Sequence, residues 1–439
     1  MDGERRTAAL SRELEPDRGV DPGTGLLIER PGESTNFEPF WVRAGDTLAL
    51  KDPSAAYRIS FYRPGPDPRL LFTYCYQPEA NWTVFAPEES DRAWKTEPTV
   101  FSGAGCVRVT VRGGHSLRLE EVMELASAPG AEDSDPLPPS WIAEEADRVA
   151  GRVKKVLRDS DAALALLTDT HYAIGCNWPD TAESLRQVRA RLPLAGVIHL
   201  GDVTDGSLPE TWTRRFAGRV LTDLRSLGLP ADGCLGNHDA NYFLGNAHPM
   251  DKAACSRLYL GRGVPWYTRD LAEVRVRMFF LDSFDPAREQ RYGFSGEEIS
   301  WLEKELRRVP EGWRVLVFSH VPPLARLHVW SSEILGSAEV LRVLTRFHRE
   351  RSGAVLGWIH GHNHADQIYT GEAFPIVSVG CTKTEAFPEH KPRGSVTRER
   401  RWGEPSQELW DVLVLHAHSR DFDLIRFGAG ADRHTLPVG

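Results

Sequence analysis

The sequence predicts an α/β domain that is preceded by a small all-β domain. In residues 141–430, apolar runs of strand length alternate with amphipathic stretches of helix length. In residues 23–125, apolar and polar residues alternate within short runs, and turn clusters rich in Gly and Pro separate these runs. A chain of 439 residues also exceeds the usual size of a single hydrophobic core, so two domains agree with its length.

The N-terminal part is expected to form a β-sandwich. Residues 1–22 are polar, and we expect them to be disordered. In the run 106–112 the three valines would face the core, whereas Arg108, Thr110 and Arg112 would face water. Runs of this kind indicate an antiparallel sandwich of about 100 residues. Its aromatic residues could form a platform for a sugar or a protein, although filling the core or the domain interface is the role that we favour: Trp41, Tyr57, Tyr74, Tyr76, Trp82 and Trp94.

A linker leads into the α/β domain. Residues 126–140 combine Pro, Gly and acidic residues, which is typical of a linker. Ser140 is expected to cap a helix at 141–157, whose apolar side chains fall on one face. Further helices are expected at 182–191, 210–227, 296–308 and 339–351, and strands at 163–167, 197–200, 315–318, 355–359, 376–379 and 410–415.

Five short polar motifs carry the chemistry, and most of them follow a predicted strand. Ligands placed beyond strand ends lie on loops that a rigid sheet holds in place. Two of the motifs have candidate ligands separated by one residue, and in an extended segment such residues point to the same side. The motifs are Asp169-Thr-His171, Gly201-Asp202, Gly236-Asn237-His238-Asp239, Ser319-His320 and Gly361-His362-Asn-His364.

Together the motifs offer a ligand set for transition metals. Imidazoles, carboxylates and one amide oxygen, without a thiolate, suit Mn, Fe or Zn better than Mg or Ca. Seven side chains are too many for one catalytic ion, whereas two adjacent divalent or trivalent ions that share Asp202 would use all seven and leave room for water and substrate. Such a pair is suited to hydrolysis of a phosphate ester by a bridging hydroxide. The candidate ligands are Asp169, His171, Asp202, Asn237, His320, His362 and His364.

In their order and spacing, the motifs resemble those of the calcineurin-like metallophosphoesterase family over residues 163–365. The resemblance implies a four-layer α/β/β/α sandwich, with two facing sheets and helices on the outside. It makes His238 the catalytic histidine, which would meet the leaving group in its protonated form, with the carboxylate of Asp205 as its partner. It also implies one metal on Asp169, His171, Asp202 and His364, and a second on Asp202, Asn237, His320 and His362.

Three positions separate the chain from two branches of that family. Asp205 stands where purple acid phosphatases have a metal-binding tyrosine. Gly206-Ser207 stands where serine/threonine phosphoprotein phosphatases have an arginine, and Asp239 stands where they have a glutamate. What remains is a bacterial-type group that acts on phosphomonoesters, phosphodiesters and nucleotides, so the substrate stays open.

Three functional hypotheses follow. A single Gly-Asp is common in solvated turns, but five motifs in this order favour a dimetal-dependent phosphohydrolase that acts on a small phosphomonoester or phosphodiester. The second hypothesis is a metal-dependent nuclease of the same superfamily, and the formal net charge of −9 and the lack of an evident nucleic-acid-binding module count against it. The third is a catalytically idle scaffold whose N-terminal domain binds a protein or carbohydrate, and the retention of His238 and Asp205 counts against it.

Residues near the motifs are candidates for the walls of a substrate pocket. The aromatic residues of 240–268 could stack a nucleobase or support the loop, and support is the role that we favour. Arg326, His328 and Trp330 follow His320 and are candidates for a second wall, although His328 could equally face water. Basic residues of 383–401 could add positive potential at the mouth of the pocket.

We expect a cytoplasmic protein without a membrane partner. Residues 1–18 are charged and lack an apolar core, and no uncharged run is long enough to cross a bilayer. The six cysteines are dispersed without a Cys-x-x-Cys pair, which disfavours a zinc knuckle. Whether Cys75 and Cys106 form a disulfide stays open.

Overall fold

The computed structural model divides the chain into two compact units. The first comprises Met1–Leu137 with Ile174–Cys176, and the second comprises Pro138–Ala173 with Asn177–Gly439. The residues described are 14–20, 27–36, 40–42, 45–62, 89–90, 94–101, 105–113, 116–126, 139–172, 177–206, 210–242, 249–328, 330–384, 391–401 and 403–438.

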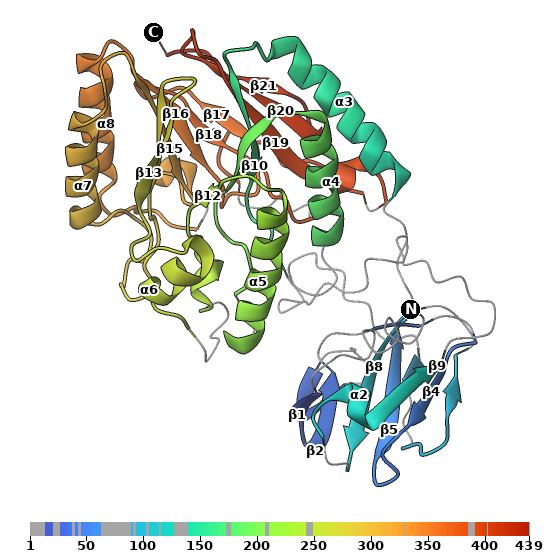
Figure 1. The fold of residues 1–439 in the computed structure, drawn as a ribbon. Coiled ribbons are helices and arrows are strands. Elements are labelled where there is room, and N and C mark those ends of the chain that lie inside the picture. The colour runs from blue at the N-terminus through green and yellow to red at the C-terminus, as the bar shows by residue number, and fades with distance from the viewer. Residues whose placement is uncertain are drawn as a thin grey trace. The chain divides into compact units, whose positions relative to one another are not determined.

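The first unit is built from antiparallel strands (Figure 1). Its larger sheet has the order β1-β2-β8-β5-β6, with β3 also paired to β8, and its smaller sheet has the order β7-β4-β9. Apolar side chains from both sheets, such as Leu48 and Val109, share one core, so the predicted all-β architecture is confirmed. The elements are β1 (Leu14–Val20), β2 (Leu27–Asn36), β3 (Phe40–Val42), β4 (Thr47–Leu50), β5 (Ala56–Tyr62), β6 (Glu89–Ser90), β7 (Thr99–Val100), β8 (Gly105–Arg112), α2 (Leu119–Val122) and β9 (Met123–Ala126).

Two expectations for this unit were wrong. Residues 14–20 were expected to be disordered, but they form β1, which pairs with β2 and buries Leu14. In β8 the valines are buried as predicted, yet Arg108 and Thr110 are buried as well. On this second face of β8, Thr110 Oγ1 accepts a hydrogen bond from the buried Thr35 of β2, so the face is covered as well.

The aromatic residues of this unit divide between core and surface where the structure describes them. Tyr57 is buried in the core, as favoured. Trp94 is partly buried, with the guanidinium groups of Arg58 and Arg112 at 4.3 Å and 4.4 Å from its ring centre. Tyr74, Tyr76, Trp82 and Cys75 lie outside the described residues.

The second unit contains two six-stranded sheets. The first sheet has parallel strands at one end and antiparallel pairings through the rest, whereas the second sheet has parallel strands in the centre and an antiparallel strand at each edge. The first sheet has the order β12-β11-β10-β19-β20-β21, and the second has the order β13-β14-β15-β16-β18-β17. Their bounds are β10 (Ala162–Leu167), β11 (Leu194–His199), β12 (Ala231–Gly233), β13 (Tyr267–Leu271), β14 (Val276–Phe280), β15 (Arg314–Ser319), β16 (Val355–His360), β17 (Gln367–Tyr369), β18 (Ile376–Ser378), β19 (Leu409–Leu415), β20 (Phe422–Gly428) and β21 (Arg433–His434).

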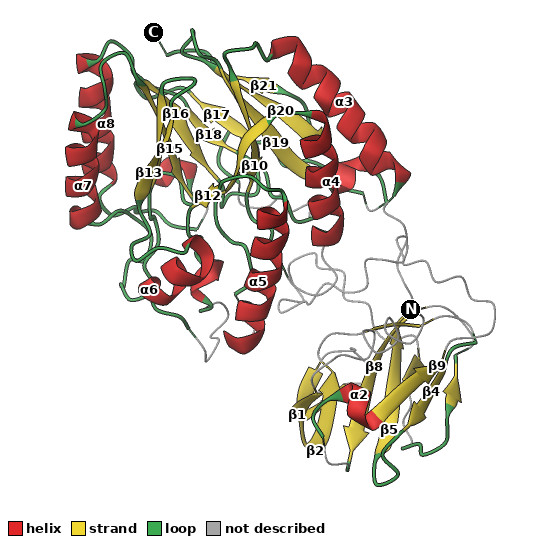
Figure 2. Cartoon of the chain, in the orientation of Figure 1, coloured by secondary structure: helices red, strands yellow, loops and turns green. Residues whose placement is uncertain are grey.

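Helices cover the outer faces of the two sheets, as Figure 2 shows. α3 packs on α4 and on β20, while α7 and α8 pack together outside the second sheet. α3 begins at Ser140 with Pro139 at its N-cap position, so the predicted capping by the Ser140 side chain was wrong. The helices are α3 (Ser140–Val156), α4 (Trp178–Arg191), α5 (Glu210–Ser226), α6 (Lys252–Cys255), α7 (Gly296–Arg307) and α8 (Ser337–Glu350).

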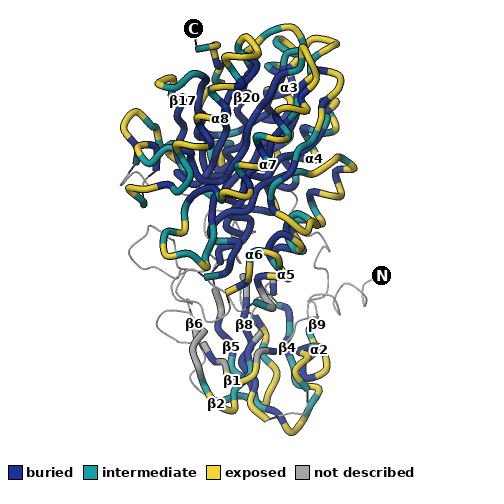
Figure 3. The backbone as a smooth tube through the Cα atoms, turned by 90° about the vertical axis from the view of Figure 1, so that its left-hand side faces the viewer, coloured by how far each residue is buried: buried dark blue, intermediate teal, exposed yellow. Residues whose placement is uncertain are grey.

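The main core lies between the two sheets. It joins side chains of the first sheet, such as Leu164 and Leu413, to side chains of the second, such as Met278 and Phe318. A second core lies beneath α7 and α8. Strands β10, β15 and β16 are buried along their whole length, which is typical of sheets covered on both faces (Figure 3). The four-layer α/β/β/α arrangement is therefore confirmed.

Among the described helices, none combines the length and the apolar character that a bilayer span requires.

Candidate metal centre

The candidate ligands lie on loops that follow strands of both sheets. Parallel strands place their C-terminal ends at one edge of a sheet, and this applies to β10, β11 and β12 and to β15 and β16. A hydrogen bond of 2.9 Å between His320 Nδ1 and Leu200 O joins the two edges. Asp169 and His171 follow β10, Asp202 follows β11, and Asn237 follows β12. His320 follows β15, and His362 and His364 follow β16.

The ligand loops are strained. Five of the seven candidate ligands have a positive φ, in a region that non-glycine residues rarely occupy and that costs about 1–3 kcal/mol per residue. The extended backbone predicted for the two ligand pairs separated by one residue is therefore wrong. The φ values are 52° for Asp169, 40° for His171, 55° for Asp202, 68° for His362 and 50° for His364.

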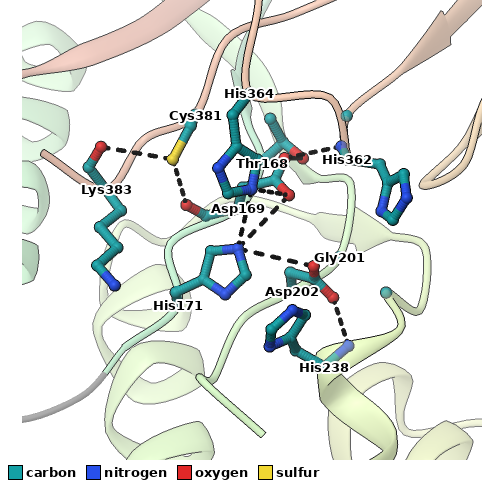
Figure 4. Close-up of polar contacts among 12 residues, drawn as sticks. Thr168, Asp169, His171, Gly201, Asp202, His238, His362, His364, Cys381 and Lys383 are labelled. Atoms are coloured by element: carbon teal, nitrogen blue, oxygen red, sulfur yellow. Dashed lines mark hydrogen bonds and ion pairs between the residues drawn. The ribbon is translucent and has the colours of Figure 1, made fainter. Parts of the chain in front are cut away.

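The first group of ligand atoms surrounds Asp169 and His171 (Figure 4). His364 Nε2 lies 3.1 Å from both Asp169 Oδ1 and His171 Nε2. His171 Nε2 lies 3.7 Å from Asp169 Oδ1 and 3.7 Å from Asp202 Oδ2. The donor atoms of Asp169, His171 and His364 all lie within 4.8 Å of one another, so they can hold one ion, and Asp202 approaches this group at His171.

The second group surrounds His320 and shares Asp202 with the first. His320 Nε2 lies 3.1 Å from Asp202 Oδ2, from Asn237 Oδ1 and from His362 Nδ1. Asp202 Oδ2 is thus close to atoms of both groups, as a bridging ligand requires. His362 and His364 belong to different groups, although one residue separates them in the sequence.

The two groups fit transition metals. An ion with ligands at about 2.1 Å in octahedral geometry has neighbouring ligands about 3 Å apart, which agrees with the repeated spacing of 3.1 Å. The donor atoms are imidazole nitrogens and carboxylate or amide oxygens, which suit Mn, Fe or Zn. All seven side chains are largely buried, so an ion here would be shielded from bulk water.

Without a cation, the histidines and carboxylates of the site shift the pKa values of one another. Burial opposes the effect, but Asp202 and Asp169 raise the pKa of His320 to about 9. In return, His320 and its neighbours overcome the effect of burial and lower the pKa of Asp202 to about 2. Metal binding at the second group therefore has to displace a proton from His320.

A buried carboxylate to which the sequence assigned no structural role holds two of the motifs together. Asp239 accepts hydrogen bonds from four backbone N–H groups: Asp202 at 3.0 Å, Val203 at 2.8 Å, Gly236 at 2.9 Å and Thr204 at 3.4 Å. Burial, together with the charge of Asp202, raises the pKa of Asp239 to about 7, whereas the N–H donors lower it. A cation on Asp202 would cancel the repulsion and leave Asp239 ionised.

A buried ion network supports the loop of His362 and His364. Asp366 pairs with Arg426 at 2.7 Å and with Arg433 at 3.0 Å, and Arg426 also pairs with Asp411 at 2.9 Å. Although burial opposes it, Arg426 and Arg433 lower the pKa of Asp366 to about 2. No periodic pattern indicates this network, since its members are widely separated along the chain.

His238 lies at the edge of the first group. Its backbone N–H donates to Asp202 Oδ1 at 2.7 Å, and its ring lies 4.5 Å from the ring of His171. Nδ1 of His238 lies 2.5 Å from the main-chain oxygen of Asp205, whereas the sequence suggested the Asp205 carboxylate as its partner. Burial lowers the pKa of His238, against the effect of Asp202.

Other residues named from the sequence take structural or peripheral positions. His199 bonds to Thr170 Oγ1 at 3.1 Å and accepts from Gly201 N at 3.2 Å. Lys383 is buried in the loop that follows β18, and its backbone N–H donates to Asp169 O at 3.1 Å. Cys234, Cys255 and Cys381 are buried free thiols.

The sequence comparisons agree with this geometry. Residues 163–366 match the model of the family described as calcineurin-like phosphoesterase. No curated protein sequence matches the chain.

Solved structures include distant relatives. A dimetal phosphatase from Danio rerio is 18% identical, with a TM-score of 0.46, and the match covers 63% of this chain and 99% of that chain. A putative 5′-nucleotidase from Staphylococcus aureus is 14% identical, with a TM-score of 0.34, covering 63% and 54%. A phosphopantetheinyl hydrolase from Mycobacterium tuberculosis is 15% identical, with a TM-score of 0.32, covering 51% and 91%. Resemblance at this level identifies no substrate.

Proposed function

We propose that the protein is a dimetal-dependent phosphohydrolase acting on a phosphomonoester or phosphodiester, because residues 163–366 match the model of the calcineurin-like phosphoesterase family. The observation that carries the proposal is the convergence of two ligand groups on Asp202 Oδ2. A shared carboxylate between two groups of nitrogen and oxygen donors is what a pair of adjacent catalytic ions requires.

The proposal assigns each group to one ion. Asp169, His171, Asp202 and His364 would hold the first. Asp202, Asn237, His320 and His362 would hold the second. When bound, Mn, Fe or Zn ions polarise a phosphoryl oxygen and bring the pKa of a shared water close to neutrality. The buried loops around the ligands exclude bulk water from this chemistry.

His238 would assist departure of the leaving group. Its Nδ1–H donates to the Asp205 carbonyl, which leaves Nε2 as the nitrogen that can meet a substrate oxygen. Burial lowers the pKa of His238, so the negative charge of a bound phosphate has to raise it again for the ring to act as an acid. In this proposal Asp205 fixes the tautomer of His238 through its backbone.

The proposed activity is tested by adding Mn, Fe or Zn to the metal-free protein and measuring turnover of bis(p-nitrophenyl) phosphate and p-nitrophenyl phosphate. His238→Ala should lower turnover on the order of 100-fold or more, as for loss of an acid–base group. His434→Gln is a matched control, because His434 is half exposed and pairs with Asp421 and Asp423. Unchanged turnover in His238→Ala would remove the assigned role.

We also place the reaction in the cytoplasm, with a small phosphate ester as partner. The three buried free thiols support a reducing compartment. A role of the N-terminal unit in binding a protein or carbohydrate is part of the same proposal. Recovery of the protein from a membrane or extracellular fraction would contradict the location, and pull-down or glycan-array experiments with the full chain test the binding role.

A further inference from the structure

An exposed tryptophan stands beside the second ligand group. The Trp330 side chain is 46% exposed and is the only aromatic one among the large exposed hydrophobic side chains of the described residues. Its ring centre lies 4.8 Å from that of His362, whose Nδ1 belongs to the second group. The indole is therefore open to solvent on one side and in contact with a candidate metal ligand on another.

His328 lies beneath this tryptophan with a fixed tautomer. Its Nδ1 accepts hydrogen bonds from the backbone N–H groups of Trp330 at 3.0 Å and Ser331 at 2.8 Å. A nitrogen that accepts two N–H groups carries no proton, so the ring bears its proton on Nε2. The residue is only 8% exposed, and within the described part of the chain Nε2 meets no acceptor.

A second unused donor lies close by. His362 faces the ligand group through Nδ1, and its buried Nε2 likewise meets no acceptor in the described residues. The centres of the His328 and His362 rings are 4.7 Å apart. Leaving a buried donor unpaired costs about 1–3 kcal/mol, so two of them at one place indicate an acceptor that a bound molecule supplies.

Aromatic rings and positive charge surround these donors. The Tyr292 ring lies 4.5 Å from His328 and 5.4 Å from His362. Lys391 Nζ donates to Asn363 O at 2.7 Å and lies 5.9 Å from the Trp330 ring centre. The position thus combines a flat apolar surface, ring N–H donors and a cation, which suits a planar group that carries acceptor atoms and is attached to a phosphate.

We propose that Trp330 and His328 form the subsite for the organic group of the substrate, and that this group is a nucleobase or similar heteroaromatic ring. The base stacks on the Trp330 indole, whose movement exposes the covered Nε2–H of His328, and this N–H then donates to a nitrogen or oxygen acceptor of the substrate. The inference rests on the proposed phosphohydrolase activity and names the substrate class of that same site.

The test compares adenosine 5′-monophosphate with ribose 5-phosphate, which differ only in the base. If only diesters are hydrolysed, the pair is the p-nitrophenyl ester of thymidine 5′-monophosphate and methyl p-nitrophenyl phosphate, which share a leaving group. Trp330→Leu should lower kcat/KM for the nucleotide by roughly 5- to 150-fold, the range for loss of one base–aromatic stack. It should leave kcat/KM for the substrate without a base unchanged. Trp330→Phe, which keeps a flat ring, should retain most of the preference.

Two variants of His328 separate its two hydrogen-bonding roles. His328→Asn keeps an acceptor for the backbone N–H groups of Trp330 and Ser331 but loses the Nε2–H donor. It should lower nucleotide kcat/KM roughly 3- to 10-fold with unchanged thermal stability. His328→Gln restores a donor near the Nε2 position and should recover part of that loss. Leu436→Ala removes another exposed apolar side chain, after β21, and should change nothing.

Calorimetric binding of the two ligands to the Mn-loaded protein gives a readout that needs no turnover. Binding preference for the nucleotide that disappears in Trp330→Leu supports the subsite even if no ester is hydrolysed, and in that case only the catalytic proposal fails. Hydrolysis without preference for the nucleotide, or an equal loss for both substrates in Trp330→Leu, overturns the subsite and leaves the catalytic proposal standing. The subsite is also overturned if the protein prefers a hexose phosphate as strongly as the nucleotide, because a sugar ring would then be enough for recognition.

Discussion

Asp239 connects the two motifs that supply Asp202 and Asn237, and its replacement by asparagine should weaken both stability and metal binding. The Oδ1 atom accepts from Val203 N and Thr204 N, and the Oδ2 atom accepts from Asp202 N and Gly236 N. Asparagine can keep the bonds to one oxygen, but its amide NH2 group would then face the two remaining N–H donors.

The expected magnitude follows from these bonds. Loss of two hydrogen bonds to a charged acceptor, each contributing about 1.5–3 kcal/mol, corresponds to about 3–6 kcal/mol. Burial offsets most of this, since it raises the pKa of Asp239 from 3.8 to about 7, which corresponds to about 4 kcal/mol against the ionised carboxylate at pH 8. We therefore expect Asp239→Asn to lower the free energy of unfolding of the metal-free protein by at most about 2 kcal/mol, and metal affinity to fall on the order of 10- to 100-fold.

Urea denaturation of the metal-free protein at pH 8 measures the first quantity, and competition with a chromophoric chelator measures the second. The control is Asp147→Asn, which removes an exposed carboxylate paired with Arg191 on the protein surface and should leave stability and metal affinity nearly unchanged. If Asp239→Asn binds metal as tightly as the parent, the argument that this carboxylate positions the ligand loops through four N–H groups is wrong.

Three further predictions concern protons and buried charges. Against the effect of burial, Asp202 and Asp169 raise the pKa of His320 to about 9, so the ring is protonated below that pH. Affinity for metal should therefore rise about tenfold per pH unit up to pH 9. Calorimetry in two buffers of different ionisation enthalpy should detect release of a proton on metal binding, and no release would contradict this. Burial raises the pKa of Glu408 from 4.5 to about 7, so its stabilising contribution is present below pH 4.5 and is lost as pH rises through 7. The free energy of unfolding of Glu408→Gln should therefore exceed that of the parent by about 3 kcal/mol at pH 8 and equal it at pH 4.5. Parallel pH profiles of unfolding for the two proteins would refute this. Arg426→Met leaves Asp366 and Asp411 buried without this partner and should lower the free energy of unfolding by about 3–5 kcal/mol. Arg346→Met at the exposed pair with Glu303 should lower it far less, and similar losses in urea denaturation would contradict the distinction.

The parts of the fold that follow local patterns could be predicted from the sequence. Fully apolar runs such as 163–167 and 315–318 form buried central strands, since both faces of these sheets are covered. β1 was missed because most of its residues are polar, and its order comes from pairing with β2, the next strand in the chain. Burial of Arg108 was missed for a similar reason, since an alternating pattern does not reveal that a strand is covered on both faces.

The motifs located the candidate metal centre, but not its supports. The structure brings all seven predicted ligands together, while the hydrogen bonds of Asp239 and the ion network of Asp366 depend on contacts between distant segments. The sequence predicted Asp205 as the partner of His238, but the group that contacts Nδ1 is the backbone oxygen of Asp205. A sequence motif identifies the residue and does not show whether its carboxylate or its backbone makes the contact. His328 was left undecided from the sequence, since the N–H groups that fix its tautomer arise only from the turn at 328–331.

The most direct test of the account measures metal content and hydrolysis on one sample. The metal-free protein is reconstituted with Mn, Fe or Zn, analysed for bound metal by mass spectrometry, and assayed with both p-nitrophenyl esters. The account predicts two ions per chain together with turnover, and loss of both in Asp202→Ala, because Asp202 is shared by the two ligand groups. Two bound ions without hydrolysis of either ester, or hydrolysis that persists in Asp202→Ala, would contradict it.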